Sequence, residues 1–269
     1  MTADFLGVTR ERLYSPGKVD DDRAILEAVA AQLATAHRVR VVSADEPLPE
    51  IAASTLVFAM CQGPAALAAL RAWEAAGVRV VNRAAAIANT QRRAMLAAFE
   101  RCAIAHPPSR VVRTDAPAEL PDWIGTCGAW IKRGDVHATE AGDVVHVDDA
   151  VAARAALAAL HRRDIAGALV QRHVAGDVFK FYAVRGRYFA CFPPPDAVAA
   201  LSTVEHERMR ALADAGAAAL GLEVFGGDCV RAADGALWLI DLNDWPSFAR
   251  CRSAAAAAIA AYLAHAAAA

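Results

Sequence analysis

The stretch 226–248 constrains the fold of this chain more than any other, because two apolar runs in it flank a strong turn signal. The signal is Asp234-Gly235, a dipeptide typical of two-residue β-hairpin loops. Counting outward from such a loop places Asp228 directly opposite Asp241 on the neighbouring strand. The sequence therefore predicts a hairpin that carries two carboxylates side by side.

A third oxygen donor lies on the same face of this hairpin. Side chains alternate along a strand, so Asn243 points to the same side as Asp241. Two carboxylates and an amide oxygen form a donor set that suits Mg²⁺, which leaves other coordination positions open for phosphates. The alternative is that Asp228, Asp241 and Asn243 are ordinary polar residues at a solvated sheet edge.

Composition narrows the classes of partner. The chain has 269 residues, a net charge of −2 and a pI of about 6.4, so neither bulk nucleic-acid binding nor attraction to an anionic membrane is expected. The six cysteines form no Cys-x-x-Cys pair, which argues against a zinc site. No apolar leader opens the chain, and a cytoplasmic location with free thiols is the expectation.

The first 84 residues alternate between predicted strands and helices. This alternation indicates a small parallel α/β unit, and the absence of Gly-x-Gly-x-x-Gly argues against a dinucleotide site. The predicted strands are 4–9, 39–42, 56–60 and 78–81, and the predicted helices are 20–36 and 65–76.

The remaining chain predicts two further groups of strands with helices between them. A second hairpin, with Arg185-Gly186 as its loop, places Lys180 opposite Cys191. Lys180 lies in an apolar run and therefore needs a polar partner. The predicted helices are 87–101, 151–163 and 205–220, and the other predicted strands are 111–113, 129–132, 144–147, 168–171, 178–184 and 188–192.

Several of these segments together resemble the ATP-grasp superfamily. The shared features are a lysine at a strand end, Lys132, a polar stretch at 171–177, and the Asp-x-Asn pair with its cross-strand aspartate. The segments Phe179-Lys180-Phe181-Tyr182, Phe225-Gly226-Gly227-Asp228 and 241–248 are most similar to inositol-phosphate kinases of the inositol trisphosphate 5/6-kinase type. The resemblance covers about residues 81–262.

This resemblance implies an α/β fold with α+β lobes, the ATP-grasp fold, preceded by a Rossmann-like pre-ATP-grasp domain. The implied division is 1–84 for that domain, 85–170 for the amino-terminal ATP-grasp lobe and 171–269 for the carboxyl-terminal lobe, which carries the Mg²⁺ site. ATP and Mg²⁺ are the implied ligands, and they bind between the two lobes.

The resemblance also implies roles for individual residues. Lys132 and Lys180 are the expected catalytic lysines, because an ammonium group neutralises phosphate charge. The metal set is Asp228, Asp241 and Asn243. The expected ATP-binding residues are Arg92 or Arg93, Lys132, Gln171, Arg172, His173, Val174, Asp177 and Lys180, and the substrate candidates are Arg133, His137 and Arg250.

The acceptor of the γ-phosphate stays open at this point. A hydroxyl acceptor makes the protein a kinase, which is the main expectation from the resemblance. A carboxylate acceptor makes it an ATP-dependent carboxylate–amine ligase that works through an acylphosphate. The apolar stretch Cys191-Phe192-Pro193, where those kinases carry an arginine, weakens the kinase interpretation. A catalytically inactive nucleotide-binding scaffold is the third alternative. In the first two cases the partner is a small-molecule phosphate or carboxylate acceptor.

Overall fold

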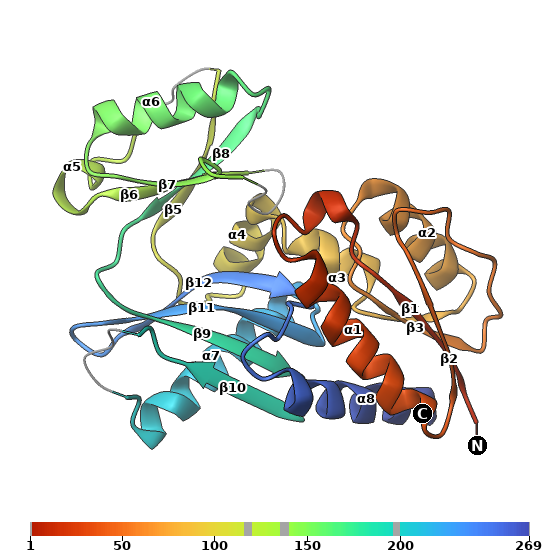
Figure 1. Cartoon of the computed structure of the whole chain (residues 1–269). Helices are drawn as coiled ribbons and strands as arrows, with labels where there is room; N and C mark the ends of the chain where they lie inside the picture. The colour runs from red at the N-terminus through yellow and green to blue at the C-terminus, as the bar shows by residue number, and fades with distance from the viewer. Residues whose placement is uncertain (1, 116–119, 135–139, 196–199, 269) are drawn as a thin grey trace.

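The computed structural model describes residues 2–115, 120–134, 140–195 and 200–268. In this part of the chain the strands form three four-stranded sheets, each with helices packed against it (Figure 1). Among the described residues no helix is both long and apolar enough to cross a membrane.

The amino-terminal sheet is parallel throughout and has the order β2-β1-β3-β4. This arrangement confirms the α/β unit predicted from the first 84 residues. Its elements are β1 (Asp4–Val8), η1 (Arg12–Tyr14), α1 (Val19–Ala34), β2 (Arg38–Val42), β3 (Thr55–Ala59), α2 (Pro64–Ala75) and β4 (Arg79–Val81).

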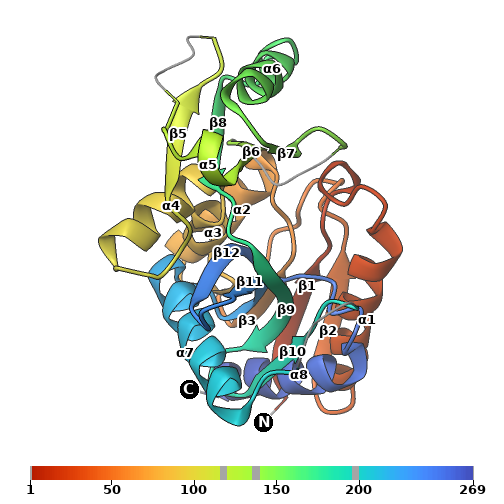
Figure 2. The same cartoon turned by 90° about the vertical axis from the view of Figure 1, so that its left-hand side faces the viewer.

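The second sheet is antiparallel, has the order β5-β8-β6-β7 and lies apart from the amino-terminal sheet (Figure 2). Helix α6 packs on one face of it, and apolar side chains such as Ile131, Val170 and Leu157 form the core between them. The elements are β5 (Ser109–Arg113), α5 (Ile124–Cys127), β6 (Ala129–Arg133), β7 (Val144–Val147), α6 (Ala150–His161) and β8 (Gly167–Arg172).

The third sheet is also antiparallel and has the order β10-β9-β11-β12. Apolar side chains of its strands, including Phe181 and Leu239, pack against Met209 of α7 (Thr203–Leu220) and Phe99 of α4 (Arg92–Arg101). Its elements are β9 (Gly176–Val184), β10 (Tyr188–Phe192), α7 (Thr203–Leu220), β11 (Val224–Ala232), β12 (Leu237–Asp244) and α8 (Arg252–Ala268).

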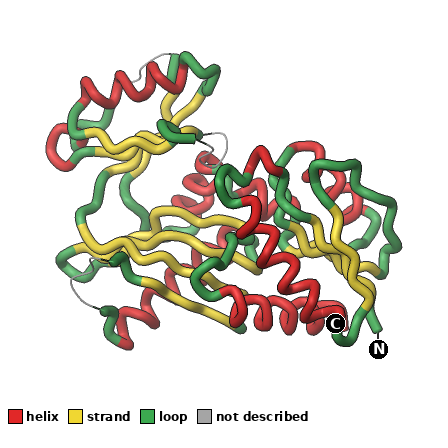
Figure 3. The backbone as a smooth tube through the Cα atoms, in the orientation of Figure 1, coloured by secondary structure: helices red, strands yellow, loops and turns green. Residues whose placement is uncertain are grey.

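The single helix predicted over 87–101 is wrong. The structure has α3 (Ala84–Asn89) and α4 (Arg92–Arg101) instead, separated at Thr90 and Gln91. Gln91 is extended, with φ −60° and ψ 132°, and the Thr90 hydroxyl donates to the carbonyl of Ile87. This break makes Arg92 the first residue of α4. Figure 3 shows how helices, strands and loops alternate along the backbone.

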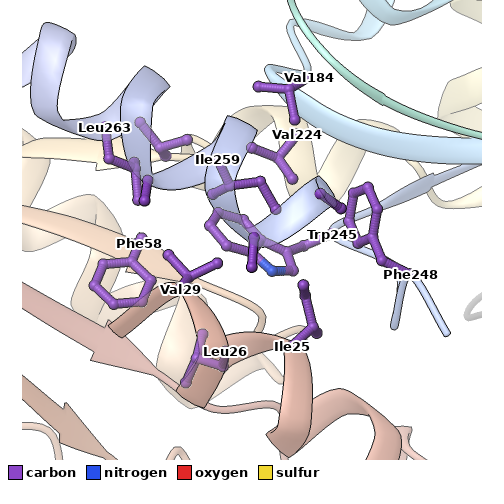
Figure 4. Packing of buried hydrophobic residues seen from close by; sticks show 14 of the residues in the cluster. Ile25, Leu26, Val29, Phe58, Val184, Val224, Trp245, Phe248, Ile259 and Leu263 are labelled. Atoms are coloured by element: carbon purple, nitrogen blue, oxygen red, sulfur yellow. The ribbon is translucent and has the colours of Figure 1, made fainter. Parts of the chain in front are cut away.

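A core of apolar side chains joins the first sheet to the third. Helices α1 and α8 lie against each other there, and Trp245 lies fully buried between them and β3 (Figure 4). Residues from both 1–84 and 171–269 contribute to this core, so these two parts of the chain do not pack independently. The division into domains after residues 84 and 170 stays a prediction, and the second boundary falls inside β8.

Asn82 connects the first sheet to β11 through its side chain. The residue is fully buried, and its Oδ1 accepts hydrogen bonds from the main-chain N–H groups of Glu223 and Val224 at 2.8 and 2.9 Å. Its Nδ2 donates to the carbonyl oxygen of Val224 at 2.7 Å. One side chain therefore satisfies three main-chain groups at the junction.

We expect Asn82→Ala to lower the free energy of unfolding by about 2–4 kcal/mol, because it leaves buried main-chain groups unpaired. Urea unfolding followed by circular dichroism measures this loss. Asn89→Ala is the matched control, since Asn89 donates a single hydrogen bond, to the carbonyl of Leu220 at 3.1 Å. An Asn82 variant no less stable than the Asn89 variant contradicts the assigned role.

Candidate active site

Three charged side chains lie in one row across the third sheet. Lys180 of β9 and Asp241 of β12 are the register partners of Asp228, which lies on β11 between them. The predicted pairing of Asp228 with Asp241 is therefore confirmed. Lys180 Nζ lies 2.9 Å from Asp228 Oδ1, so Asp228 is the partner that this lysine needs among its apolar neighbours.

The pairing arises from two compensating deviations from the predicted hairpin. The loop is one residue longer than the predicted Asp234-Gly235. Two main-chain hydrogen bonds close it: the N–H of Gly235 donates to the carbonyl of Ala232, and the N–H of Ala232 donates to the carbonyl of Ala236. A bulge on β12, where Ile240 is the additional residue between the pairs Cys229–Leu239 and Asp228–Asp241, then restores the register at the carboxylates.

The second hairpin has a longer loop than predicted as well. Lys180 pairs with Phe192, not with Cys191, because the N–H of Arg187 donates to the carbonyl of Val184 and a three-residue loop separates the strands. The position of Lys180 in the row is unaffected, since its pairing with β11 fixes it.

Asp241 carries an unsatisfied oxygen. Its Oδ1 is buried and has no hydrogen-bond partner among the described residues. Asn243 lies two positions further along β12 and is partly buried. A buried acceptor without a donor costs free energy unless a ligand binds there. Two carboxylates and an amide oxygen therefore fit Mg²⁺ at this end of the sheet.

Close packing of β11 against β12 requires a glycine at position 227, directly before Asp228. A Cβ atom at this position would lie 2.2 Å from the main-chain oxygen of Asp241, closer than atoms can approach. Glycine thus lets β11 and β12 approach each other beside the two carboxylates.

Lys132 projects from the second sheet toward these carboxylates. It lies on the face of β6 opposite the core residues Ala129 and Ile131, and only 5 % of it is exposed. Burial lowers the pKa of Lys132 to about 8, against the opposing effect of the Asp241 and Asp228 charges, while the Arg92 charge lowers it further. No carboxylate in the described part of the chain forms an ion pair with it.

The structure distinguishes between the two arginines considered for the upstream basic position. Arg92 is buried and donates from Nη1 to the carbonyl oxygen of Arg133 at 2.8 Å, whereas Arg93 is exposed. The charge of Arg92 also lowers the pKa of Lys132. Arg92, and not Arg93, therefore belongs to the same cationic group as Lys132.

A cavity of about 270 Å³ lies between the second and third sheets, beside the row of charges. Its wall combines apolar side chains with a few polar groups, which is the usual make-up of a small-molecule site. The lining residues are Pro107, Trp130, Lys132, Val144, Gln171, Arg172, His173, Val174, Gly176, Val178, Asp228, Val230 and Ile240.

Four predicted nucleotide-binding residues reach this cavity at the end of β8. Gln171 is buried, and its register partner across the sheet is Trp130. Arg172 is exposed, and its Nε lies 3.3 Å from the sulfur of Cys127. His173 and Val174 follow in the connection to β9 and complete this side of the wall.

Sequence reasoning missed Trp130 and His146, which pack with the predicted residue His173. The indole N–H of Trp130 donates to Nδ1 of His173 at 3.1 Å, and the ring of His146 packs edge-on against both. Burial lowers the pKa of His173, and the neighbouring His146 charge lowers it further. The signal was the alternation in β6, which puts Trp130 on the same face as Lys132.

Asp177 does not reach the cavity. Its Oδ2 accepts from Nη2 of Arg231 at 2.7 Å, and Arg231 also lies over the ring of Phe179. Because Phe179 faces the core between the third sheet and α7, Asp177 points away from the face that carries Lys180. Asp177 is therefore not among the residues that we propose to bind ATP.

The two substrate candidates that the structure describes, Arg133 and Arg250, have separate partners. Arg133 donates to Asp143, which is fully buried and also binds Arg163. Arg250 lies in the other lobe, exposed, with its guanidinium over the ring of Phe192. His137 lies outside the described residues.

Arg10 and Gln62, also missed by sequence reasoning, hold the end of β12 from the amino-terminal sheet. Arg10 Nη2 donates to the carbonyl oxygens of Asp244 and Trp245 at 3.2 and 2.8 Å. Gln62 Nε2 donates to Oδ1 of Asp244 at 2.6 Å. Burial raises the pKa of Asp244 to about 6. These contacts fix the main chain next to Asn243.

No family model and no curated protein matches this chain. Solved structures do. D-alanyl-alanine synthetase A from Vibrio cholerae is 12 % identical, with a TM-score of 0.69 over 92 % of this chain and 90 % of that one. A RimK domain ATP-grasp protein from Sphaerobacter thermophilus is 22 % identical, with a TM-score of 0.68 over 97 % and 99 %. The chain has an ATP-grasp fold.

A third structure supports the same fold. D-alanine–D-alanine ligase from Bacillus anthracis, determined with ATP, is 11 % identical, with a TM-score of 0.69 over 99 % of this chain and 92 % of that one. The expected ATP-grasp fold is therefore confirmed. None of the three structures is an inositol-phosphate kinase.

Proposed function

We propose that this protein is an ATP-dependent carboxylate–amine ligase that binds Mg-ATP between its second and third sheets. The observation that carries the proposal is the position of Lys132, which faces Asp228 and Asp241 across the cavity between these sheets. Cations from one lobe and carboxylates from the other are what a metal–triphosphate complex requires.

Each charged group has a role in this proposal. The metal, held by Asp228, Asp241 and Asn243, supplies charge neutralisation at the phosphate oxygens. Lys132 and Lys180 bind phosphate oxygens as point charges and neutralise the charge that develops in the transition state. Gln171, His173 and Val174, which line the cavity at the end of β8, bind the adenine base.

The reaction then takes two steps. A carboxylate oxygen of the acceptor attacks the γ-phosphorus, and the bond to the β-phosphate oxygen breaks, which gives an acylphosphate and ADP. The nitrogen of an amine attacks the acyl carbon, the bond to the phosphate oxygen breaks, and the amine loses a proton. No side chain of the protein becomes covalently modified.

Two observations favour the ligase over the kinase. Two of the three structures with the same fold are named as ligase or synthetase for D-alanine. The two arginines considered for binding a phosphorylated acceptor also have separate partners. Arg133 forms an ion pair with Asp143, and Arg250 lies over the ring of Phe192. A highly phosphorylated acceptor requires several cations at one place.

Hydroxylamine trapping tests this proposal without knowledge of the natural amine. The chain is incubated with ATP, Mg²⁺, hydroxylamine and single carboxylic or amino acids, and hydroxamate and ADP are measured. We expect hydroxamate to form in amounts equal to ADP with at least one class of carboxylate. Phosphorus NMR of parallel reactions with inositol phosphates is the counter-test. A stable new phosphoester there, with no hydroxamate in the first assay, overturns the ligase in favour of the kinase.

A further inference from the structure

Asp228, one of the proposed metal ligands, already forms an ion pair with a lysine of the same chain. The ammonium of Lys180 lies 2.9 Å from Asp228 Oδ1, and the two residues are register partners on neighbouring strands. The β-sheet thus fixes their main chains side by side, so this pairing requires no rearrangement of the fold.

The second carboxylate, that of Asp241, differs from the carboxylate of Asp228. Asp241 Oδ1 is buried without a hydrogen-bond partner among the described residues, although Asp241 is the register partner of Asp228. Two adjacent carboxylates repel each other, and Lys180 offsets this repulsion through its ion pair with Asp228 and, more weakly, through its attraction to Asp241. A divalent cation that binds Asp228 through Oδ1 therefore has to displace Lys180 from it.

Lys180 is able to leave this position. Its side chain is 43 % exposed, and that of Asp228 is 28 % exposed, so the ion pair lies at the edge of the cavity and not in the core. An ion pair with this exposure is weak and easily exchanged for another anion. Lysine also has a flexible four-carbon stem, which lets its ammonium move while the strand stays in place.

We propose that Lys180 is an internal counter-cation that competes with the divalent metal for Asp228 and gives way when nucleotide phosphates bind. The inference rests on the proposed function, because phosphates supply the alternative partner for the ammonium. Without nucleotide the metal binds weakly. With nucleotide Lys180 moves to a phosphate and Asp228 becomes available, so each ligand strengthens the binding of the other by the same factor.

Manganese titration followed by electron paramagnetic resonance tests the competition in the absence of nucleotide. We expect Lys180→Met to bind Mn²⁺ about fivefold to tenfold more tightly than the wild type, since a weak ion pair no longer has to be broken. Lys18→Met is the matched control, because Lys18 is exposed and forms no ion pair within the described residues. Unchanged or weaker Mn²⁺ binding by a folded Lys180→Met variant overturns the proposal. Lys180→Arg, which keeps a cation, is expected to bind Mn²⁺ as weakly as the wild type, and tight binding by it has the same consequence.

Lysine-selective NMR follows the displacement itself. The chain contains only three lysines, Lys18, Lys132 and Lys180, so the three variants to methionine assign every labelled side-chain signal. We expect a non-hydrolysable ATP analogue to shift the Lys180 signal before Mg²⁺ is added, and Mg²⁺ alone to shift it only at high concentration. A Lys180 signal that stays unchanged when the analogue and Mg²⁺ are both bound overturns the proposal.

The two proposals fail in different ways. Hydroxamate formation tests the ligase and does not depend on how Lys180 behaves without nucleotide. A missing hydroxamate together with tighter Mn²⁺ binding by Lys180→Met overturns the ligase alone. Hydroxamate formation together with unchanged Mn²⁺ binding overturns the counter-cation alone.

Discussion

Replacing Asp241 by asparagine lowers ATP-dependent hydroxamate formation by about 10³-fold, because the charge of a metal ligand is worth several kcal/mol in a transition state that concentrates negative charge. The fold tolerates the change. Asp241 Oδ1 has no hydrogen-bond donor to lose among the described residues, and asparagine has the same shape. We therefore expect a thermal midpoint close to that of the wild type, since the change removes both the repulsion between Asp241 and Asp228 and the attraction of Asp241 to Lys132.

Asp234→Asn is the matched control for this variant. Asp234 belongs to the same hairpin, is exposed, and accepts a hydrogen bond from the N–H of Ala236 that an asparagine oxygen can also accept. It is expected to keep full activity. Hydroxamate formation by Asp241→Asn within tenfold of the Asp234→Asn rate excludes Asp241 as a metal ligand. A large loss of stability in Asp241→Asn shows instead that the carboxylate is structural.

The row of charges was predictable because a β-hairpin converts sequence spacing into position. Asp228 and Asp241 pair as counting outward from the turn predicts, but the count succeeds only because the longer loop and the bulge cancel each other. At the second hairpin no bulge follows the longer loop, and the predicted partner of Lys180 is wrong by one residue. Turn type is set by a few dihedral angles, and Asp-Gly and Arg-Gly are compatible with more than one loop length.

Contacts between distant segments were not predictable in this way. Arg92 and Arg93 are adjacent in sequence, and only the break between α3 and α4 decides which of them is buried near Lys132. Arg10 and Asn82 bind main-chain groups of the third sheet, which carry no side-chain signal in the sequence. The alternation of strands and helices predicted the first sheet correctly, because periodicity indicates which face of an element is buried. Periodicity does not indicate which other element covers that face.

Lys132→Met is expected to change nucleotide affinity and stability in opposite directions. The pKa of Lys132 falls from its ordinary value of 10.5 to about 8 on folding, so burial of the ammonium outweighs its attraction to Asp241 and Asp228. A shift of this size corresponds to about 3 kcal/mol of unfavourable folding free energy at neutral pH. Removing the charge should raise the free energy of unfolding by about 1–3 kcal/mol and weaken binding of a non-hydrolysable ATP analogue at least tenfold, by roughly the value of a charge-assisted hydrogen bond.

The difference in stability between Lys132→Met and the wild type is expected to depend on pH. Between pH 8 and 10.5 the unfolded chain keeps the proton on Lys132 while the folded chain loses it, so the wild type gains stability as the pH rises through this range. Below pH 8 both states are protonated and the penalty is constant. Urea unfolding at pH 7 and pH 10 should therefore show a large advantage of Lys132→Met at pH 7 and a small one at pH 10. Calorimetric titration should show analogue binding to the wild type weakening above pH 8, as the ammonium loses its proton, while Lys18→Met follows the wild type in both assays. A Lys132→Met variant that is less stable than the wild type at pH 7 would mean that the buried ammonium stabilises the fold and is not held there at a cost for phosphate binding.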